Sequence, residues 1–221
     1  MLGDRLEQVR DSIRSAAQRA GRDERELTLI VVTKFQPVSV IEELSALGIT
    51  DFGESRHQEA SQKASQLAGR GLRWHFVGQL QSKKARAVAS YCQVVHSLDR
   101  ESLLEQLSQA PKPIDCFIEL NLTDDPGRGG VPISNLIPFA EKVLAQDSIR
   151  LLGVMAVASI GKDPRSEFAK VRDASESLKS IAPNANFISA GMSGDFQEAI
   201  LEGATHLRIG TAITGPRPQS G

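Results

Sequence analysis

The stretch Leu29-Ile30-Val31-Val32-Thr33, followed by Lys34-Phe35-Gln36-Pro37, decides the fold of this chain. An apolar, largely β-branched run that stops at a proline-containing turn predicts a buried strand. Lys34 would stand at the end of that strand, where a rigid element sets the direction of its side chain. Amines in such positions can form Schiff bases with carbonyl compounds. A surface lysine that merely follows the strand is the alternative, and the local sequence on its own favours it.

Similar apolar runs recur along the chain and alternate with helical patterns. The chain opens with an amphipathic helix that ends near Gly21. Strand-like runs are expected at residues 28–33, 49–52, 73–77, 93–96, 114–121, 151–156, 186–189 and 206–209. Helical patterns lie between them at residues 38–47, 56–67, 83–90, 100–109, 133–144, 165–181 and 195–201.

The alternation of strands and helices predicts a parallel sheet with helical crossovers. Eight such units in 221 residues fit an α/β fold, a single (β/α)₈ TIM barrel with an extra N-terminal helix. An open doubly wound sheet would need a glycine-rich loop after its first strand, where this chain has Lys34-Phe35-Gln36-Pro37. No linker divides the chain, so we expect one domain over residues 1–221, with a flexible tail at residues 216–221.

The composition excludes several classes of protein. The chain is 40% hydrophobic and 24% charged, and its net charge of −1 leaves no basic surplus for nucleic acid or an anionic membrane. No apolar segment approaches the ~20 residues that span a bilayer, and the N-terminus lacks the apolar core of a signal peptide. Cys92 and Cys116 are expected to be buried free thiols, which suits a cytoplasmic protein. The four histidines show no metal-ligand spacing.

In a (β/α)₈ barrel the functional face is formed by the C-terminal ends of the strands and the loops that follow them. Polar or small residues recur at this end, and stability alone does not require that asymmetry. Lys34, His75, Asn121 and Met155 are candidates to line a pocket there. His75 could equally be a hydrogen-bonded core histidine. The polar, glycine-rich loop at residues 123–130 predicts a mobile flap over the mouth or, alternatively, a long turn.

Two glycine-containing turns follow the last two strands. Gly191-Met192-Ser193-Gly194 precedes a helical pattern, so its backbone N–H groups can bind an anion. Gly210-Thr211 adds further N–H groups and a hydroxyl. Barrels often bind phosphate in these two loops, so we predict an anion site there, although the glycines could be turn residues and Ser193 a helix cap. Arg208, beside them, would pair with phosphate, with a ring acceptor or with a carboxylate such as Glu119.

In combination, these segments resemble the pyridoxal phosphate homeostasis protein family, whose members are alanine-racemase-like barrels without the second domain of the racemase. The resemblance covers the chain from about Leu6 to Gly215. It is carried by Val31-Val32-Thr33-Lys34, Phe52-Gly53-Glu54, Gln58-Glu59, Trp74-His75-Phe76-Val77-Gly78-Gln79-Leu80-Gln81, Gly191-Met192-Ser193-Gly194-Asp195-Phe196-Gln197-Glu198-Ala199-Ile200 and Leu207-Arg208-Ile209-Gly210-Thr211-Ala212-Ile213.

The resemblance implies that Lys34 holds pyridoxal 5'-phosphate (PLP) as a Schiff base and that Arg208 faces its pyridine nitrogen. A positive charge opposite that nitrogen disfavours its protonation, and an unprotonated ring is a poorer electron sink. The phosphate would be held by Ser193, Gly194, Gly210 and Thr211. The chain departs from the family pattern at Ser55-Arg56, where many members have Asn-Tyr, and at Gln79, where many have His.

The function implied is PLP binding in intracellular PLP homeostasis, by a monomeric carrier that buffers the cofactor or delivers it to PLP-dependent apoenzymes, without being an enzyme. The alternative is a racemase-like enzyme with weak activity on amino acids. Two-base racemisation needs an acid or base on each face of the cofactor, and the single tyrosine, Tyr91, is predicted at the wrong end of the barrel. A phosphate-binding barrel with unrelated carbonyl chemistry is a third possibility.

Overall fold

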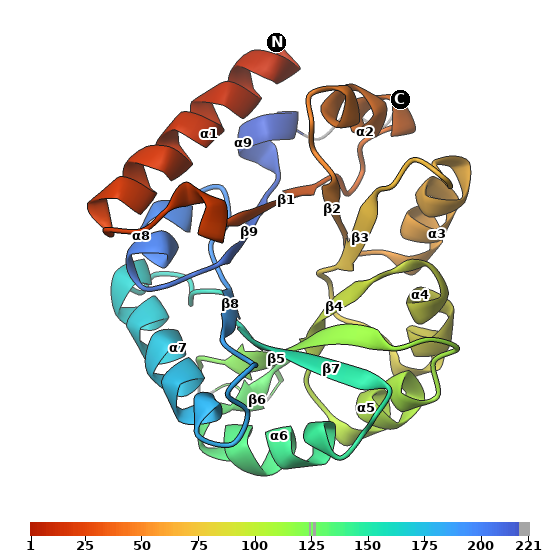
Figure 1. Cartoon of the computed structure of the whole chain (residues 1–221), viewed down its shortest axis with the longest axis vertical. Coiled ribbons are helices and arrows are strands. Elements are labelled where there is room, and N and C mark those ends of the chain that lie inside the picture. Colours follow the sequence, from red (N-terminus) through yellow and green to blue (C-terminus); the bar gives the residue numbers. More distant parts are fainter. Residues whose placement is uncertain (124, 126, 217–221) are drawn as a thin grey trace.

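The structure is a computed structural model that describes residues 1–123, 125 and 127–216. Eight parallel strands close into a barrel surrounded by helices, as predicted (Figure 1). Closure follows from the pairing, because β1 pairs with both β2 and β9, and β4 pairs with β5. The barrel strands are β1 (Thr28–Val32), β2 (Asp51–Glu54), β3 (Arg73–Phe76), β4 (Val94–Leu98), β5 (Ile114–Asn121), β7 (Ile149–Met155), β8 (Phe187–Ser189) and β9 (His206–Ile209).

The predicted helices are present with ends that differ by a few residues. They are α1 (Leu2–Arg19), α2 (Val38–Ala46), α3 (His57–Gln66), α4 (Ala85–Tyr91), α5 (Glu101–Ser108), α6 (Leu136–Leu144), α7 (Pro164–Lys179) and α8 (Phe196–Leu201). Further short elements were not predicted: β6 (Val131–Pro132), α9 (Thr211–Thr214) and the 3₁₀ helices η1 (Glu24–Glu26), η2 (Ser82–Lys84) and η3 (Ile133–Asn135).

The extra N-terminal helix packs on the outside of the barrel. Its apolar stripe, which includes Leu6, Val9 and Ile13, is buried. The helix lies along α8 and α9, the two elements that follow the last barrel strands (Figure 1). Arg5 Nε donates to the carbonyl oxygen of Ile213 at 2.6 Å, which ties the first helix to α9.

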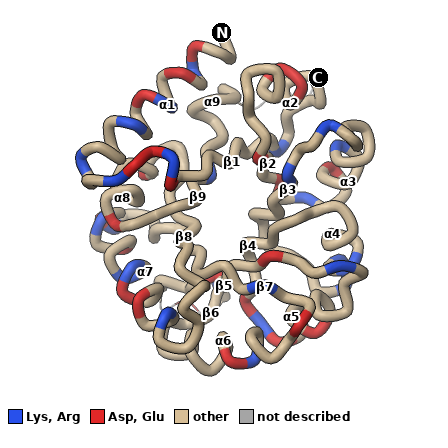
Figure 2. The backbone as a smooth tube through the Cα atoms, in the orientation of Figure 1, with Lys and Arg blue, Asp and Glu red and all other residues tan. Residues whose placement is uncertain are grey.

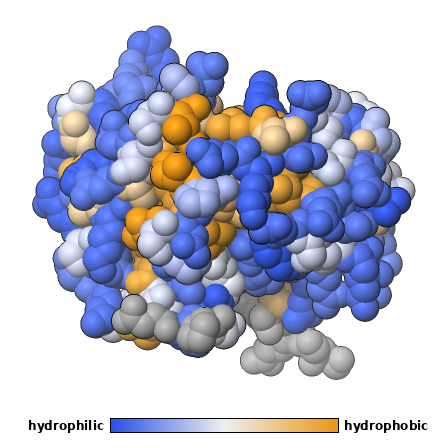
Figure 3. Space-filling view, turned by 90° about the horizontal axis from the view of Figure 1, so that it is seen from below, coloured by the Kyte–Doolittle hydropathy of each residue, from blue (hydrophilic) through white to orange (hydrophobic). Residues whose placement is uncertain are grey.

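The core has two layers because successive strand residues point to opposite faces of the sheet. The larger layer lies between strands and helices and includes Val95, Ile118 and Val154. A smaller cluster of Val94, Phe117, Leu152 and Met155 lies on the other face, inside the barrel. Most charged residues lie on the outer elements (Figure 2). The face in Figure 3 is largely hydrophilic with apolar patches between.

Three further expectations can be compared with the structure. Cys92 and Cys116 are buried free cysteines, as predicted. Within the described part of the chain, no helix is long and apolar enough to cross a membrane. The tail expected at residues 216–221 lies outside the described residues, except for Pro216.

Candidate functional site

Lys34 lies in a tight turn directly after β1. The turn is closed by a hydrogen bond from Gln36 N to the carbonyl oxygen of Thr33 at 3.0 Å, and the Lys34 side chain is exposed. The next residue, Phe35, has a φ of 67°, a left-handed conformation that is strained for a bulky side chain. Such strain persists only where surrounding groups hold it, so the turn needs external support.

A buried lysine supplies part of that support. Lys63 reaches in from α3 and donates to the carbonyl oxygen of Thr33 at 2.8 Å, to Glu54 Oε1 at 2.7 Å and to Glu59 Oε1 at 2.6 Å. The Lys63 and Glu54 side chains are only 6% and 1% exposed. The peptide group that precedes Lys34 is therefore fixed by a buried ion cluster.

The same cluster holds the other side of the turn. Glu59 Oε1 accepts a hydrogen bond from the backbone N–H of Phe35 at 2.5 Å, and Glu54 Oε1 accepts one from the Thr33 hydroxyl at 2.7 Å. Burial raises the pKa of Glu54 despite the attraction of Lys63. We refer to Glu54, Glu59 and Lys63 as the clamp. Because the clamp binds peptide groups on both sides of Lys34, it sets the direction in which the lysine leaves β1.

The sequence analysis missed Lys63, although the sequence carries a signal for it. Lys63 lies on the inner face of α3 between Ala60 and Leu67, both buried, at the spacing of an apolar stripe. A lysine at such a position is seldom buried unless it is paired. Glu59, four residues earlier on the same helix, could be read from sequence as a partner. The contacts with Glu54 on β2 and with the carbonyl oxygen of Thr33 could not.

The two turns predicted to bind an anion lie together in the structure. Ser193, after β8, accepts hydrogen bonds at its Oγ from the backbone N–H of Ala212 at 3.2 Å and from the Thr211 hydroxyl at 3.3 Å. Gly191 has a φ of 90°, and a Cβ there would lie 2.8 Å from the Cα of Phe196. Only glycine fits this bend, which brings the Ser193 loop against the first turn of α9.

Gly210 links this pair of turns to β1. A Cβ on Gly210 would lie 3.3 Å from the carbonyl oxygen of Val32, so the backbone after β9 passes close to the end of β1. Val32 is two residues before Lys34. The exposed Thr211 hydroxyl, the partly exposed Ser193 hydroxyl and the Lys34 turn therefore occupy one end of the barrel. This end offers an amine beside hydroxyl and N–H donors, a combination that suits a phosphorylated carbonyl compound.

Arg208 is buried below this mouth, with 4% of its surface exposed. Its Nη1 donates to Ser189 Oγ at 2.6 Å and its Nη2 to the carbonyl oxygen of Ala156 at 2.9 Å. Burial lowers the pKa of Arg208 to about 10, against the opposing effect of the Glu119 charge. The guanidinium therefore stays positively charged at neutral pH and cannot rotate freely.

Glu119, on β5, accepts a hydrogen bond from Gln79 Nε2 at 2.8 Å instead of binding Arg208 directly. Burial raises the pKa of Glu119 to about 7, and the charge of Asp99 adds to this effect. Gly129 packs so closely on Gln79 that a Cβ would lie 2.1 Å from its Nε2. Gln79, one of the departures from the family pattern, thus connects β3 to β5 and to the glycine-rich loop.

The other departure from the family pattern also has a structural role. The Arg56 guanidinium lies 4.5 Å from the centre of the Phe35 ring, a cation–π contact over the strained turn. Ser55 lies against Gly78, where a Cβ would come within 2.6 Å of the Ser55 Cβ. Both residues therefore pack around the Lys34 turn and the loop after β3.

The remaining predicted pocket residues have internal partners. His75 is fully buried inside the barrel and bonds to Asp51 and His96. Asn121 Nδ2 donates to the carbonyl oxygens of residues 125 and 128, so it holds the loop that follows β5. Met155 is 2% exposed in the inner cluster. Contact of these three side chains with a cofactor stays a prediction.

The loop predicted as a flap or a long turn is described in part. Residues 124 and 126 lie outside the described residues. The rest is held by Asn121 and by a hydrogen bond from Gly130 N to Asp99 Oδ2 at 3.3 Å, just before β6 pairs with β5. Its contacts are those of a supported turn, and movement over the mouth stays a prediction.

Fold and site together define a barrel of the alanine racemase N-terminal class. The family model described as "Alanine racemase, N-terminal domain" matches residues 5–218. The Corynebacterium glutamicum pyridoxal phosphate homeostasis protein is 38% identical over 208 residues, covering 89% of this chain and 93% of the relative. The Pseudomonas aeruginosa protein of the same name is 36% identical over 220 residues, covering 98% and 96%. This chain belongs to the pyridoxal phosphate homeostasis protein family.

A solved relative agrees with this assignment. The structure of PipY from Synechococcus elongatus PCC7942, with PLP bound, has a TM-score of 0.85 and 29% sequence identity to this chain. The match covers 97% of this chain and 100% of PipY. The barrel is therefore shared over essentially its whole length.

Proposed function

We propose that this protein binds PLP at the barrel mouth and serves to buffer the cofactor or deliver it to PLP-dependent apoenzymes, with little turnover of its own. The observation that carries the proposal is the position of the clamped Lys34 turn beside the Ser193–Thr211 pair, with Gly210 packed on the end of β1. The names of the relatives and the PLP bound to PipY support the same ligand.

Each group at the mouth has a task in this proposal. The Lys34 amine would hold PLP through the aldehyde that this cofactor supplies, with loss of water. The hydroxyls of Ser193 and Thr211 and backbone N–H groups at Gly194 and Gly210 would hold the phosphate. Arg208 would face the pyridine nitrogen, and its positive charge would disfavour protonation of that nitrogen. The site thereby suits holding PLP more than driving carbanion chemistry.

The racemase-like alternative finds little support at the mouth. Tyr91 is the last residue of α4, in the layer of helices outside the barrel, and its hydroxyl lies 3.2 Å from His57 Nδ1. Burial raises the pKa of Tyr91, so its hydroxyl is a poor proton source as well. A second acid or base on the face opposite Lys34, which two-base racemisation requires, would have to be supplied by another group.

Reduction of the loaded protein tests the covalent site. Protein mixed with PLP should be yellow, borohydride should change its absorbance, and mass spectrometry of the digest should place the adduct on Lys34. Lys34→Ala should abolish that adduct, while Lys83→Ala, which removes an exposed lysine of η2, should leave it unchanged. A wild-type protein that stays colourless and takes up no PLP contradicts the proposal.

Two assays separate a carrier from an enzyme. Loaded protein mixed with a PLP-dependent apoenzyme should restore its activity, and the time course should differ from that with an equal amount of free PLP. Incubation with L-alanine, followed by chiral chromatography, should give no D-alanine above the background of free PLP. Turnover above that background favours the racemase-like alternative.

We also propose that the protein is a monomeric, single-domain protein of the cytoplasm. The groups assigned to PLP come from one chain, and the free buried thiols of Cys92 and Cys116 suit a reducing compartment. Light scattering on the loaded and cofactor-free protein should give the mass of one chain. A dimer that forms only with PLP would contradict the monomer.

A further inference from the structure

Five polar side chains form a line across the inside of the barrel, from the end where the strands begin to the mouth. They are Asp51 on β2, His75 on β3, His96 on β4, Ser189 on β8 and Arg208 on β9. The side chain of Asp51 is 18% exposed, and each of the others is at most 4% exposed. Burial of so many polar groups in a barrel interior is unfavourable unless they bind one another.

Each neighbouring pair along this line is in hydrogen-bond contact. His75 Nε2 lies 2.9 Å from Asp51 Oδ1, and His75 Nδ1 lies 3.0 Å from His96 Nε2. His96 Nδ1 lies 2.8 Å from Ser189 Oγ. Ser189 Oγ also accepts a hydrogen bond from Arg208 Nη1 at 2.6 Å. The contacts are therefore continuous from the Asp51 carboxylate to the Arg208 guanidinium.

The charges and tautomers of these five groups allow one order of hydrogen bonds, with Arg208 as the first donor and Asp51 as the last acceptor. Burial alone would raise the pKa of Asp51, but hydrogen bonds from His75 and Thr50 outweigh it and keep that pKa below its ordinary value. Burial lowers the pKa of His75 and, more strongly, that of His96, so each ring is neutral with one proton. The Asp51 carboxylate accepts a hydrogen bond from the Nε2–H group of His75. His75 Nδ1 then accepts from His96 Nε2–H, and His96 Nδ1 accepts from the Ser189 hydroxyl.

Packing fixes the rings in the orientation that this order needs. The His96 ring stacks on Phe117 with centroids 4.7 Å apart, and the His75 and His96 ring centroids are 5.2 Å apart. Both rings are fully buried, so a flip that exchanged the nitrogens of either ring would displace neighbouring side chains inside the barrel. Packing and charge therefore favour the same arrangement of the two rings.

We propose that Asp51, His75 and His96 are positioning residues for Arg208, acting through Ser189 as one hydrogen-bond chain. Because every donor points from the guanidinium toward the carboxylate, the bond dipoles add and each bond polarises the next. This hydrogen-bond chain fixes the Arg208 guanidinium and places the compensating negative charge of Asp51 at the far end of the barrel. The inference rests on the proposed function in one respect, that Arg208 faces the cofactor ring.

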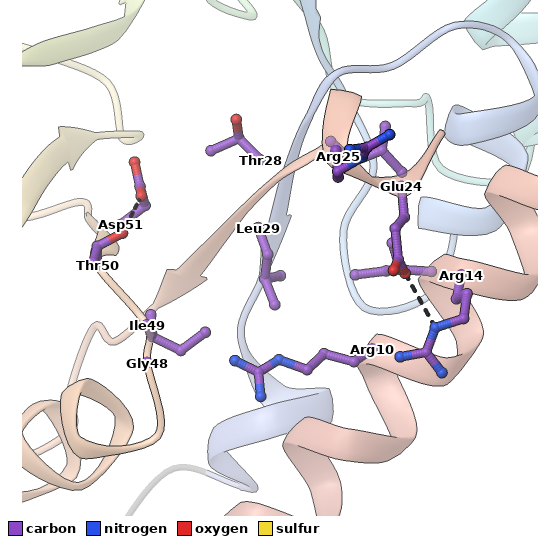
Figure 4. A pocket seen from close by; sticks show the side chains of 12 residues that line it. Arg10, Arg14, Glu24, Arg25, Thr28, Leu29, Gly48, Ile49, Thr50 and Asp51 are labelled. Atoms are coloured by element: carbon purple, nitrogen blue, oxygen red, sulfur yellow. Dashed lines mark hydrogen bonds and ion pairs between the residues drawn. The ribbon is translucent and has the colours of Figure 1, made fainter. Parts of the chain in front are cut away.

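The Asp51 end of the hydrogen-bond chain opens on a pocket that is separate from the mouth. The pocket has a volume of about 460 Å³ and lies between α1, η1 and the beginnings of β1 and β2. Asp51 and Thr28 form one side of it, and Arg10 and Arg14 reach into it from α1 (Figure 4). A substitution at Asp51 can therefore change the hydrogen-bond chain without altering any residue of the mouth.

The first test needs neither a variant nor the cofactor. Long-range ¹H–¹⁵N NMR spectra of the cofactor-free protein should show His75 and His96 as neutral rings with the proton on Nε2, unchanged between about pH 6 and 8. A proton on His96 Nδ1, or titration of either ring in that range, overturns the proposal. Failure of the wild-type protein to bind PLP leaves this result intact and contradicts only the proposed function.

The second test measures the effect of the hydrogen-bond chain on the absorbance of bound PLP. Asp51→Asn removes the charge, and Asp115→Asn is its control, because Asp115 also lies where a strand begins but pairs with Arg73 and Arg150. With PLP bound, Asp51→Asn should shift the pH midpoint of the cofactor's absorbance by about half a unit or more. Asp115→Asn should leave it in place.

Equal absorbance profiles for Asp51→Asn and Asp115→Asn overturn the positioning role. If Asp51→Asn does not fold, His75→Gln interrupts the same hydrogen-bond chain. It should shift the pH midpoint of the cofactor's absorbance in the same direction as Asp51→Asn. His206→Gln is its control, because His206 is a buried histidine of β9 that bonds Thr205 and stands outside the chain. A shift of the same size in His206→Gln would also contradict the proposal.

Discussion

The barrel mouth has two neighbouring sides: Lys34 is directed by buried charges, whereas Ser193 and Thr211 beside it meet through hydroxyls at the surface. The clamp places Lys63 and Glu54 at 6% and 1% exposure, with contacts of 2.6–2.8 Å from the lysine. The hydroxyl pair is held by contacts of 3.2 and 3.3 Å. The difference indicates that folding fixes the Lys34 turn and leaves the hydroxyls of Ser193 and Thr211 available to a ligand.

The energetics of the two sides should differ in the same way. A buried ion cluster is part of the fold, so its loss should appear as a loss of folding free energy. Surface hydroxyls contribute little to folding but bind a charged acceptor strongly.

Lys63→Met should have the largest effect. It leaves the buried carboxylate of Glu54 and the partly buried carboxylate of Glu59 without their cation. The free energy of unfolding should therefore fall by about 3–5 kcal/mol in urea titrations. Lys142→Met is the control, because Lys142 and its partner Glu101 are 53% and 62% exposed, and it should cost less than about 1 kcal/mol. A loss of similar size in both variants would remove the distinction between the two sides.

Ser193→Ala combined with Thr211→Ala should act on the ligand and leave the fold in place. Loss of two hydroxyl donors to phosphate should weaken PLP retention about 10- to 100-fold, measured by equilibrium dialysis. The free energy of unfolding without cofactor should stay within about 0.5 kcal/mol of wild type. Ser177→Ala, on the exposed face of α7, should change neither quantity. Unchanged retention in the double variant would count against the phosphate assignment.

Glu119→Gln should have a smaller, pH-dependent effect. Because the folded-state pKa of Glu119 is raised to about 7, the folded protein holds this proton more tightly than the unfolded chain does. The wild-type protein therefore loses stability as pH rises from about 4.5 through 7. Glutamine does not ionise, so the variant should gain roughly 1–2 kcal/mol relative to wild type between pH 5 and pH 8, measured by urea unfolding without cofactor. An equal difference at both pH values would contradict the shift.

Much of the barrel could be predicted from sequence because short local patterns specify its strands, helices and turns. The apolar runs, proline and glycine turns and helical spacings placed all eight barrel strands, and the glycines after the last two strands pointed to adjacent loops. The missed elements, which include β6 and α9, are too short to show a period. Tertiary contacts support them, since β6 pairs with β5 and α9 packs on α1.

The polar network of the site was less accessible to sequence reasoning. Lys63 and Asp51 gain Glu54 and His75 as partners only when neighbouring elements pack together, since Glu54 lies on β2 and His75 on β3. His75 was compatible with both a pocket wall and a core histidine, and the structure places it in the core. Pairwise distances between residues far apart in sequence depend on closure, and no local pattern encodes them.

The link between α1 and α9 has a consequence for the order in which the site is assembled during synthesis. Lys34 leaves the ribosome early, but β1 has no partner on one edge until β9 is made. The hydroxyls of Ser193 and Thr211 also emerge late, and Arg5 then reaches the carbonyl oxygen of Ile213 from the first helix. A nascent chain therefore carries Lys34 for most of its translation without the two hydroxyls that we propose to hold the phosphate. Stable capture of the cofactor would report that the barrel has been completed.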